Sequence, residues 1–81
     1  MVFHFDLYRI ADPEELAYMG FDDYLMTPAI LLVEWADRGG DWLPPPDLLV
    51  HLSPLGEGRQ LRLMPQSAQG LMVCRQLRKG L

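Results

Sequence analysis

Two short apolar runs, each with an acidic residue at or next to its C-terminal end, constrain the fold of this chain more than any other feature. The first run, Val2–Leu7, is rich in β-forming residues and contains Asp6, and the second, Ala29–Val33, leads directly into Glu34. Short, nearly continuous apolar runs are typical of strands buried on both faces of a parallel sheet. We therefore expect an α/β protein whose neighbouring strands bring Asp6 and Glu34 to one edge of the sheet.

Helix signals separate the two runs. Asp12 can cap free backbone N–H groups, Pro13 suits the first helical position, and Glu15 can complete a capping box. Gly20 is expected to end this short helix. One more helical turn is expected before Pro28 forces the preceding residue into an extended conformation.

The second half of the sequence has a different pattern. Residues 36–46 contain two adjacent glycines and three consecutive prolines, which predicts a turn-rich connection without regular structure. Residues 47–64 alternate apolar and polar side chains around a Gly-Glu-Gly turn, which predicts an antiparallel hairpin with one buried face. Ser67 can cap a final helix, although Gly70 and Val73 disfavour one. The apolar positions expected on one side of that helix are Leu71, Cys74, Leu77 and Leu81.

Composition indicates one small globular domain over residues 1–81. Of the 81 residues, 49% are hydrophobic and 22% charged, which argues against a disordered segment. The single cysteine, Cys74, excludes an intramolecular disulfide and is expected to be a small apolar filler. No apolar run approaches the roughly 18 residues that a membrane-spanning helix needs, so we expect a cytoplasmic protein without a membrane association.

Charge is divided unevenly along the chain. Residues 1–47 carry ten acidic residues against two arginines, whereas residues 48–81 carry one acidic residue against five basic ones. This division could orient an anionic ligand or a partner, although ordinary solvated faces explain it more simply. The net charge of -4 argues against direct RNA binding.

The two strand-end acids are the main candidates for chemistry. An acid that follows an apolar strand is the arrangement of a Walker B carboxylate beside a magnesium-bound triphosphate, although a turn or capping role for Asp6 is common for such residues. Mg²⁺ favours one or two carboxylates together with phosphate oxygens and water, and Asp6 with Glu34 meets that requirement. His4 and Asp6 could also share a strand face as metal ligands, but a packed histidine is the simpler interpretation.

A triphosphate site also requires a glycine-rich loop followed by lysine, G-x-x-x-x-G-K-[ST]. The 81 residues contain no such motif, and the only lysine, Lys79, is followed by Gly80 and Leu81. Nucleotide binding by these residues alone is therefore not expected, because the carboxylates would repel a triphosphate and nothing here would cradle it.

Several motifs together resemble TsaE (also called YjeE), the bacterial ATPase family of tRNA threonylcarbamoyladenosine biosynthesis. Their order and spacing match, and the similarity extends through the hairpin, over what would be the C-terminal half of the family's domain. The matching segments are His4-Phe5-Asp6-Leu7-Tyr8-Arg9, Asp12-Pro13-Glu14-Glu15-Leu16, Val33-Glu34-Trp35, Leu43-Pro44 and Gly58-Arg59.

The resemblance implies a P-loop NTPase-like fold with three layers, of which this chain would be a partial domain with strands at 2–7 and 29–34 and a hairpin at 47–64. It implies binding of ATP and Mg²⁺, ATP hydrolysis, and association with TsaB and TsaD in the modification of adenosine 37 of certain tRNAs. By the motif match, Asp6 would be the Walker B acid that holds the metal, and Glu34 would be a metal ligand or the catalytic residue that positions the attacking water. Trp35 would lie near the nucleotide or a partner surface, and Arg59 would face phosphate from the hairpin. A packed aromatic and a solvated turn arginine remain the alternatives for the last two.

Two hypotheses follow from these observations. In the first, the chain is part of the ATPase component and is inactive when isolated, because the P-loop half is missing. In the second, it is a non-catalytic module that binds partners through the surface around Trp35. In either case, open strand edges favour self-association.

Overall fold

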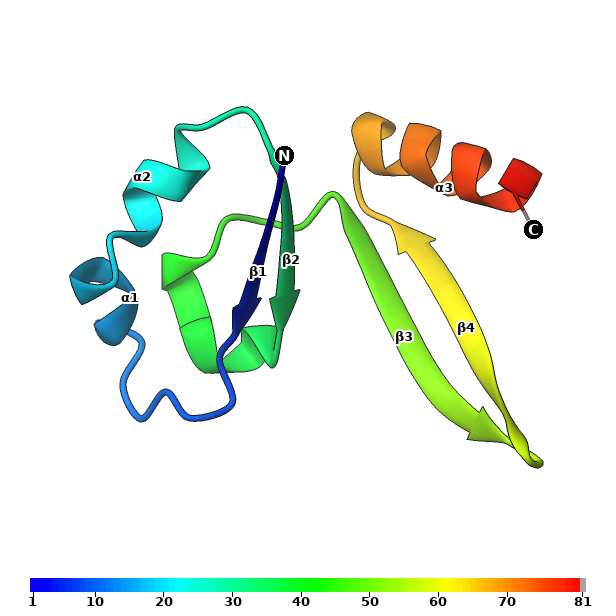
Figure 1. Cartoon of the computed structure of the whole chain (residues 1–81), viewed down its shortest axis with the longest axis horizontal. Coiled ribbons are helices and arrows are strands. Elements are labelled where there is room, and N and C mark those ends of the chain that lie inside the picture. The colour runs from blue at the N-terminus through cyan, green and yellow to red at the C-terminus, as the bar shows by residue number, and fades with distance from the viewer. Residues whose placement is uncertain (81) are drawn as a thin grey trace. The chain divides into compact units, whose positions relative to one another are not determined.

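The computed structural model describes residues 1–80, which form two compact units that divide after Pro44. The first unit contains two strands, two short α-helices between them and a final 3-10 helix. The second unit contains a hairpin followed by an α-helix (Figure 1). In chain order the elements are β1 Val2–Asp6, α1 Glu15–Tyr18, α2 Phe21–Leu25, β2 Ile30–Glu34, the 3-10 helix η1 Ala36–Trp42, β3 Leu48–Leu55, β4 Gly58–Pro65 and α3 Ala68–Gly80. This is a mixed α/β structure with small sheets, as expected. The single-domain organisation stays a prediction.

Strands β1 and β2 pair in parallel, and the predicted strand ends are correct to within a residue. Their register places Val2 opposite Ile30 and Asp6 opposite Glu34. Figure 1 shows the two arrows side by side, pointing in the same direction. The carboxyl ends of both strands therefore lie at the same edge.

One face of this strand pair packs against the core of the first unit. Leu7 and Leu16 are fully buried and Phe21 is 2% exposed. The ring of Phe5 makes edge-to-face contacts with Phe21 at 5.0 Å and with Tyr24 at 5.1 Å between centroids, a favourable geometry for aromatic pairs. These ring contacts hold α2 against β1, while Leu16 of α1 joins Leu7 and Phe21 in the buried core.

The expectation that both faces of the strands are buried is wrong for the described residues. Val2, Ile30 and Leu32 are 56%, 61% and 52% exposed, because alternate side chains of a strand point to opposite faces and only one face contacts the core. The apolar composition of the two runs correctly indicated strands. It did not indicate that the described residues cover only one face of the strand pair.

The start of α1 uses the predicted polar side chains. The Glu15 carboxylate accepts hydrogen bonds from the backbone N–H groups of Ala11 and Asp12, and Asp12 Oδ1 accepts one from the N–H of Glu14. Regular helix begins only at Glu15, two residues after Pro13. Gly20 adopts a positive φ of 71° between α1 and α2, as a helix-ending glycine should.

The prediction of an irregular connection over residues 36–46 is wrong for its first part, where η1 forms. Two adjacent glycines indicated a break, but only Gly40 departs from helical dihedral angles. Gly39 is buried, and a Cβ there would lie 2.7 Å from Leu43 Cγ and 3.2 Å from Leu16 Cδ1. The first glycine therefore serves close packing of η1 against the core.

In the second unit the antiparallel hairpin is confirmed, with Leu52 opposite Leu61 across the ladder. Its expected buried face is wrong for the described residues, since Val50, Leu52 and Leu61 are 58%, 62% and 50% exposed. Helix α3 approaches the hairpin at Asp47 and Leu48, where the strands begin and end, so most of this face has no covering element within the unit.

Helix α3 is present despite its interior glycine. Ser67 Oγ accepts a hydrogen bond from the Gly70 N–H at 3.0 Å, the expected cap, and also bonds Asp47 Oδ1 at 2.7 Å. Cys74 is buried at 3% exposure, whereas Leu71 and Leu77 are 40% and 46% exposed. The expected fourth apolar position, Leu81, lies outside the described residues. Among the helices of residues 1–80, none has the length and apolar character needed to cross a membrane.

Candidate functional site

The candidate site lies at the carboxyl-terminal edge of β1 and β2. Asp6 and Glu34 end the two strands and are partners in the parallel register, which is the juxtaposition that the sequence predicted. Both residues are exposed. The parallel pairing is what brings together two side chains that are 28 positions apart in the sequence.

Each carboxylate makes one hydrogen bond in the structure. Asp6 Oδ1 accepts the backbone N–H of Tyr8 at 3.0 Å, which is the turn role considered for an acid at a strand end. Glu34 Oε2 lies 2.9 Å from His4 Nε2. Within residues 1–80 these interactions use one oxygen of each group, so the second oxygens remain for a ligand.

The interpretation of His4 as a packed histidine is wrong. Its side chain is 57% exposed, and it pairs with Glu34 rather than with Asp6. The alternation along a strand places positions 4 and 6 of β1 on one face, and the register brings Glu34 of β2 to that same face. An exposed pair of this kind orients the glutamate while contributing little to stability.

Three further side chains lie just beyond this edge and form what we call the aromatic cluster: Tyr8, Trp35 and Arg38. The rings of Tyr8 and Trp35 are 4.9 Å apart between centroids. The Arg38 guanidinium carbon lies 5.6 Å from the Tyr8 centroid and 5.8 Å from that of Trp35, within cation–π distance of both. Trp35 was singled out from the sequence, whereas Tyr8 and Arg38 were missed as functional candidates.

Trp35 is not buried in the core, because 56% of its surface is exposed. Tyr8 is similarly exposed at 52%. The aromatic cluster therefore forms a surface beside the two carboxylates. Its only signal in the sequence was the Glu34-Trp35 pair directly after an apolar strand.

Arg59 lies in the other compact unit, beside the hairpin turn at the start of β4. Its Nη1 donates a hydrogen bond to the carbonyl of Gly58 at 3.0 Å, and the residue is exposed. This is the setting of a solvated turn arginine. Its expected contact with a nucleotide stays a prediction.

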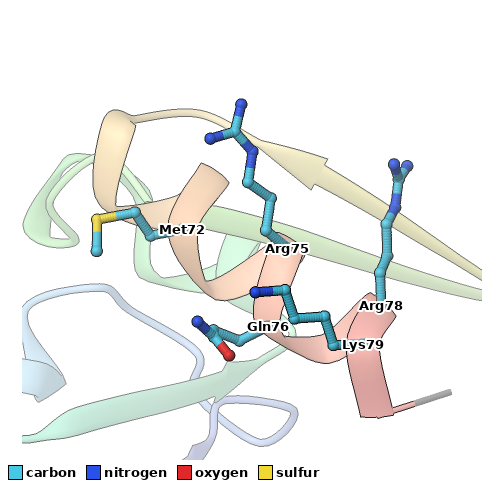
Figure 2. A pocket seen from close by; sticks show the side chains of 5 residues that line it. All are labelled: Met72, Arg75, Gln76, Arg78 and Lys79. Carbon is cyan, nitrogen blue, oxygen red and sulfur yellow. The ribbon is translucent and has the colours of Figure 1, made fainter.

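A second group of charges lies on α3, around a shallow hollow on the surface of that helix. Figure 2 shows that all the lining side chains come from this one helix. Basic residues in the last turn interact favourably with the negative end of the helix dipole, which explains the charge without a ligand. The lining residues are Met72, Arg75, Gln76, Arg78 and Lys79.

The described residues contain no group of three or more His, Cys, Asp or Glu side chains arranged to hold a metal ion. Two carboxylates are within the number that a Mg²⁺ ion usually takes from a protein when its other ligands are water and phosphate oxygens. The fold and this edge define a mixed α/β protein in which a parallel strand pair presents two acids beside an exposed aromatic cluster.

Comparison with known proteins identifies the family. The family model described as threonylcarbamoyl adenosine biosynthesis protein TsaE matches residues 1–61, a span that includes the carboxylates, the aromatic cluster and Arg59. The chain belongs to the TsaE family.

Its relatives include proteins named tRNA threonylcarbamoyladenosine biosynthesis protein TsaE from several bacteria. The Haemophilus influenzae protein is 46% identical over 70 residues, which cover 86% of this chain and 44% of that protein. The Rickettsia felis protein is 37% identical over 60 residues, covering 74% of this chain and 34% of that protein. The chain thus spans less than half the length of the relatives that it matches.

Proposed function

We propose that this chain forms part of the cytoplasmic ATPase component that acts in the formation of threonylcarbamoyladenosine at position 37 of tRNA. The observation that carries the proposal is the register of β1 and β2, which pairs Asp6 with Glu34 at one edge. Membership of the TsaE family supports the same assignment, together with a P-loop NTPase-like three-layer fold for the longer protein.

In this proposal Asp6 and Glu34 hold a Mg²⁺ ion beside the phosphates of ATP. Each has one carboxylate oxygen without a hydrogen bond among the described residues. When bound, the ion supplies positive charge that offsets the charge of the phosphates. The Glu34 carboxylate, oriented by His4, also accepts a hydrogen bond from the attacking water. Trp35 contacts the nucleotide in this proposal, and for Arg59 a nucleotide contact is proposed from the TsaE family match alone.

The 81 residues alone are proposed to be inactive. They lack the G-x-x-x-x-G-K-[ST] motif, whose backbone N–H groups and lysine hold the phosphates in P-loop proteins. A Mg²⁺ ion held by two exposed carboxylates is a weak site, because most of its ligands must come from nucleotide and water.

The test has two stages. The first is titration of the 81-residue chain with Mn²⁺, followed by electron paramagnetic resonance. Asp6→Asn and Glu34→Gln are each expected to weaken binding by about tenfold or more, since each removes one of two charged ligands. Asp22→Asn, which changes an exposed acid on α2, is the matched control and is expected to bind as the parent chain does. Equal affinity in all four proteins would refute the carboxylate site.

The second stage compares this chain with a form extended by the sequence encoded upstream of Met1. The extended form is expected to bind and hydrolyse ATP in the presence of Mg²⁺, and the 81-residue chain to do neither. Hydrolysis by the short chain would contradict the proposed inactivity. An extended form that carries the glycine-lysine motif and yet binds no ATP would contradict the ATPase assignment.

A second candidate function is a non-catalytic module that binds TsaB and TsaD. The exposure of Trp35 and Tyr8 favours it, because tryptophan, tyrosine and arginine are enriched among residues that dominate binding at protein interfaces. Capture of TsaB and TsaD by the 81-residue chain without nucleotide, with loss of capture in Trp35→Ala, is the expected result of this alternative. Capture that depends on ATP and on the upstream segment would instead support the ATPase component.

A further inference from the structure

The backbone conformation of Trp35 sets it apart from its neighbours. Its φ and ψ angles are 57° and 44°, in the left-handed region, and among residues 1–80 it is the one residue other than glycine with a positive φ. This conformation is disfavoured by roughly an order of magnitude or more in population for a residue with a Cβ atom. Some local interaction must therefore hold Trp35 there, directly after Glu34.

The aromatic cluster provides that interaction. The Tyr8 ring lies against one side of the indole at 4.9 Å, and the Arg38 guanidinium approaches both rings. The backbone N–H of Arg38 also donates to the Trp35 carbonyl at 3.0 Å. Arg38 thus contacts the indole through its side chain and closes the turn around Trp35 through its backbone.

The same segment is tied to Asp6. The N–H of Tyr8 donates to Asp6 Oδ1 at 3.0 Å, and the N–H of Leu7 donates to the Glu34 carbonyl at 3.0 Å. Tyr8 therefore bonds Asp6 through its backbone N–H and contacts Trp35, the residue after Glu34, through its ring. The cluster joins the two chain segments that leave the parallel strands.

We propose that Tyr8 and Arg38 are positioning residues, which hold Trp35 in its left-handed conformation and thereby fix Glu34 relative to Asp6. Neither side chain touches a ligand in this role. The part of the inference that concerns the metal rests on the proposed function, because it treats the two carboxylates as one ligand set. The part that concerns the backbone stands on the contacts alone.

The first experiment measures amide hydrogen exchange by NMR in the 81-residue chain. In Tyr8→Leu, exchange of the Arg38 and Leu7 amides is expected to accelerate by about tenfold. This is the factor by which the left-handed conformation of Trp35 is disfavoured when the cluster does not hold it. Tyr8→Phe keeps the ring and is expected to stay within about twofold of the parent. The matched control is Tyr18→Leu, because Tyr18 is 88% exposed and is remote in sequence from the cluster.

The second experiment tests Arg38 by the same measurement. Arg38→Met keeps much of the side-chain length but removes the charge, and it is expected to accelerate exchange at the same amides. Arg38→Lys retains a cation near the rings and is expected to restore part of the protection. If Tyr8→Leu and Arg38→Met both exchange at the rates of the parent and of Tyr18→Leu, the positioning role is refuted.

Mn²⁺ affinity then separates a positioning role from a purely structural one. Tyr8→Leu is expected to weaken Mn²⁺ binding by about tenfold while Tyr8→Phe binds as the parent does, because only the former releases Glu34 from its fixed position. If faster exchange leaves Mn²⁺ affinity unchanged, the link to the carboxylates is refuted. If the parent chain binds no Mn²⁺, the proposed metal site fails, and the exchange rates alone decide the role of Tyr8 and Arg38.

Discussion

Replacing Gly70 with alanine sets two opposing effects against each other. In the interior of an exposed helix, alanine is favoured over glycine by about 1 kcal/mol, so helix propensity alone predicts that α3 becomes more stable. In this structure, however, a Cβ at position 70 would lie 1.7 Å from the Asp47 carbonyl oxygen and 2.6 Å from its carbon. Ordinary contact begins at 3.4 Å, and the obstacle is backbone rather than the end of a flexible side chain.

The helix must therefore move away from the start of the hairpin by more than 1 Å. That movement disturbs two contacts of Asp47: the Ser67 Oγ to Oδ1 bond of 2.7 Å and the Gln66 N–H to carbonyl bond of 2.8 Å. Each bond contributes about 1 kcal/mol, and overpacking typically costs about 1–3 kcal/mol. After subtracting the gain in propensity of about 1 kcal/mol, we expect Gly70→Ala to destabilise the second unit by about 2–4 kcal/mol.

The assay is urea unfolding followed by far-ultraviolet circular dichroism, with amide exchange at Leu71 as a local measure of α3. Its N–H donates to the Ser67 carbonyl at 2.9 Å, so its protection reports whether the first turn of the helix is intact. Gly80→Ala is the matched control, because among the described residues a Cβ at that position would meet nothing within 4 Å apart from its chain neighbours and its own helix backbone. If Gly70→Ala proves as stable as Gly80→Ala, or more stable than the parent, the close approach of α3 to Asp47 is refuted.

The remaining predictions concern the first unit. Phe21→Ala is expected to cost about 3–5 kcal/mol, because the side chain is 2% exposed in the core, whereas Tyr18→Ala should cost little; thermal unfolding would show this difference, and equal melting temperatures would contradict the core assignment. His4→Ala is expected to change the free energy of unfolding by less than about 0.5 kcal/mol, since both members of its pair with a glutamate are more than half exposed, and a larger loss in urea unfolding would show that the pair is structural. Leu32→Thr, on the open face of β2, is expected to reduce self-association in sedimentation velocity without loss of stability. Leu31→Thr, on the covered face, should instead destabilise the unit. A loss of stability in Leu32→Thr but not in Leu31→Thr would contradict the assignment of faces.

The elements that follow from local patterns were predictable from the sequence. Apolar runs ending in acids indicated β1 and β2, and the position of Asp6 and Glu34 at a common edge followed from parallel pairing. Capping by Glu15 and Ser67 follows from hydrogen bonds that span only a few residues, so a reading of the local sequence sufficed. In such cases the interaction is short in sequence, and residue type alone specifies it.

Features that depend on contacts distant in sequence were not predictable in the same way. The pair of glycines in η1 indicated a break because the sequence does not reveal that Gly39 packs against Leu16. The aromatic cluster joins Tyr8 to residues nearly thirty positions later, and nothing in the local pattern indicates the left-handed conformation of Trp35. Tertiary contacts therefore decide both features, and they override local preference.

The charge around the carboxylate pair bears on the order in which a metal and a nucleotide would bind. Residues 1–47 contain two basic residues, Arg9 and Arg38, against ten acids, and the Arg38 guanidinium lies over the rings of the aromatic cluster. Two like charges 4 Å apart repel by about 1 kcal/mol even in bulk water, and a triphosphate near Asp6 and Glu34 would meet several such terms. A divalent cation at the pair changes the sign of the largest of these interactions. Under the proposed function, nucleotide binding at this edge should therefore depend on the divalent cation, whereas the cation alone should bind the carboxylates weakly without nucleotide.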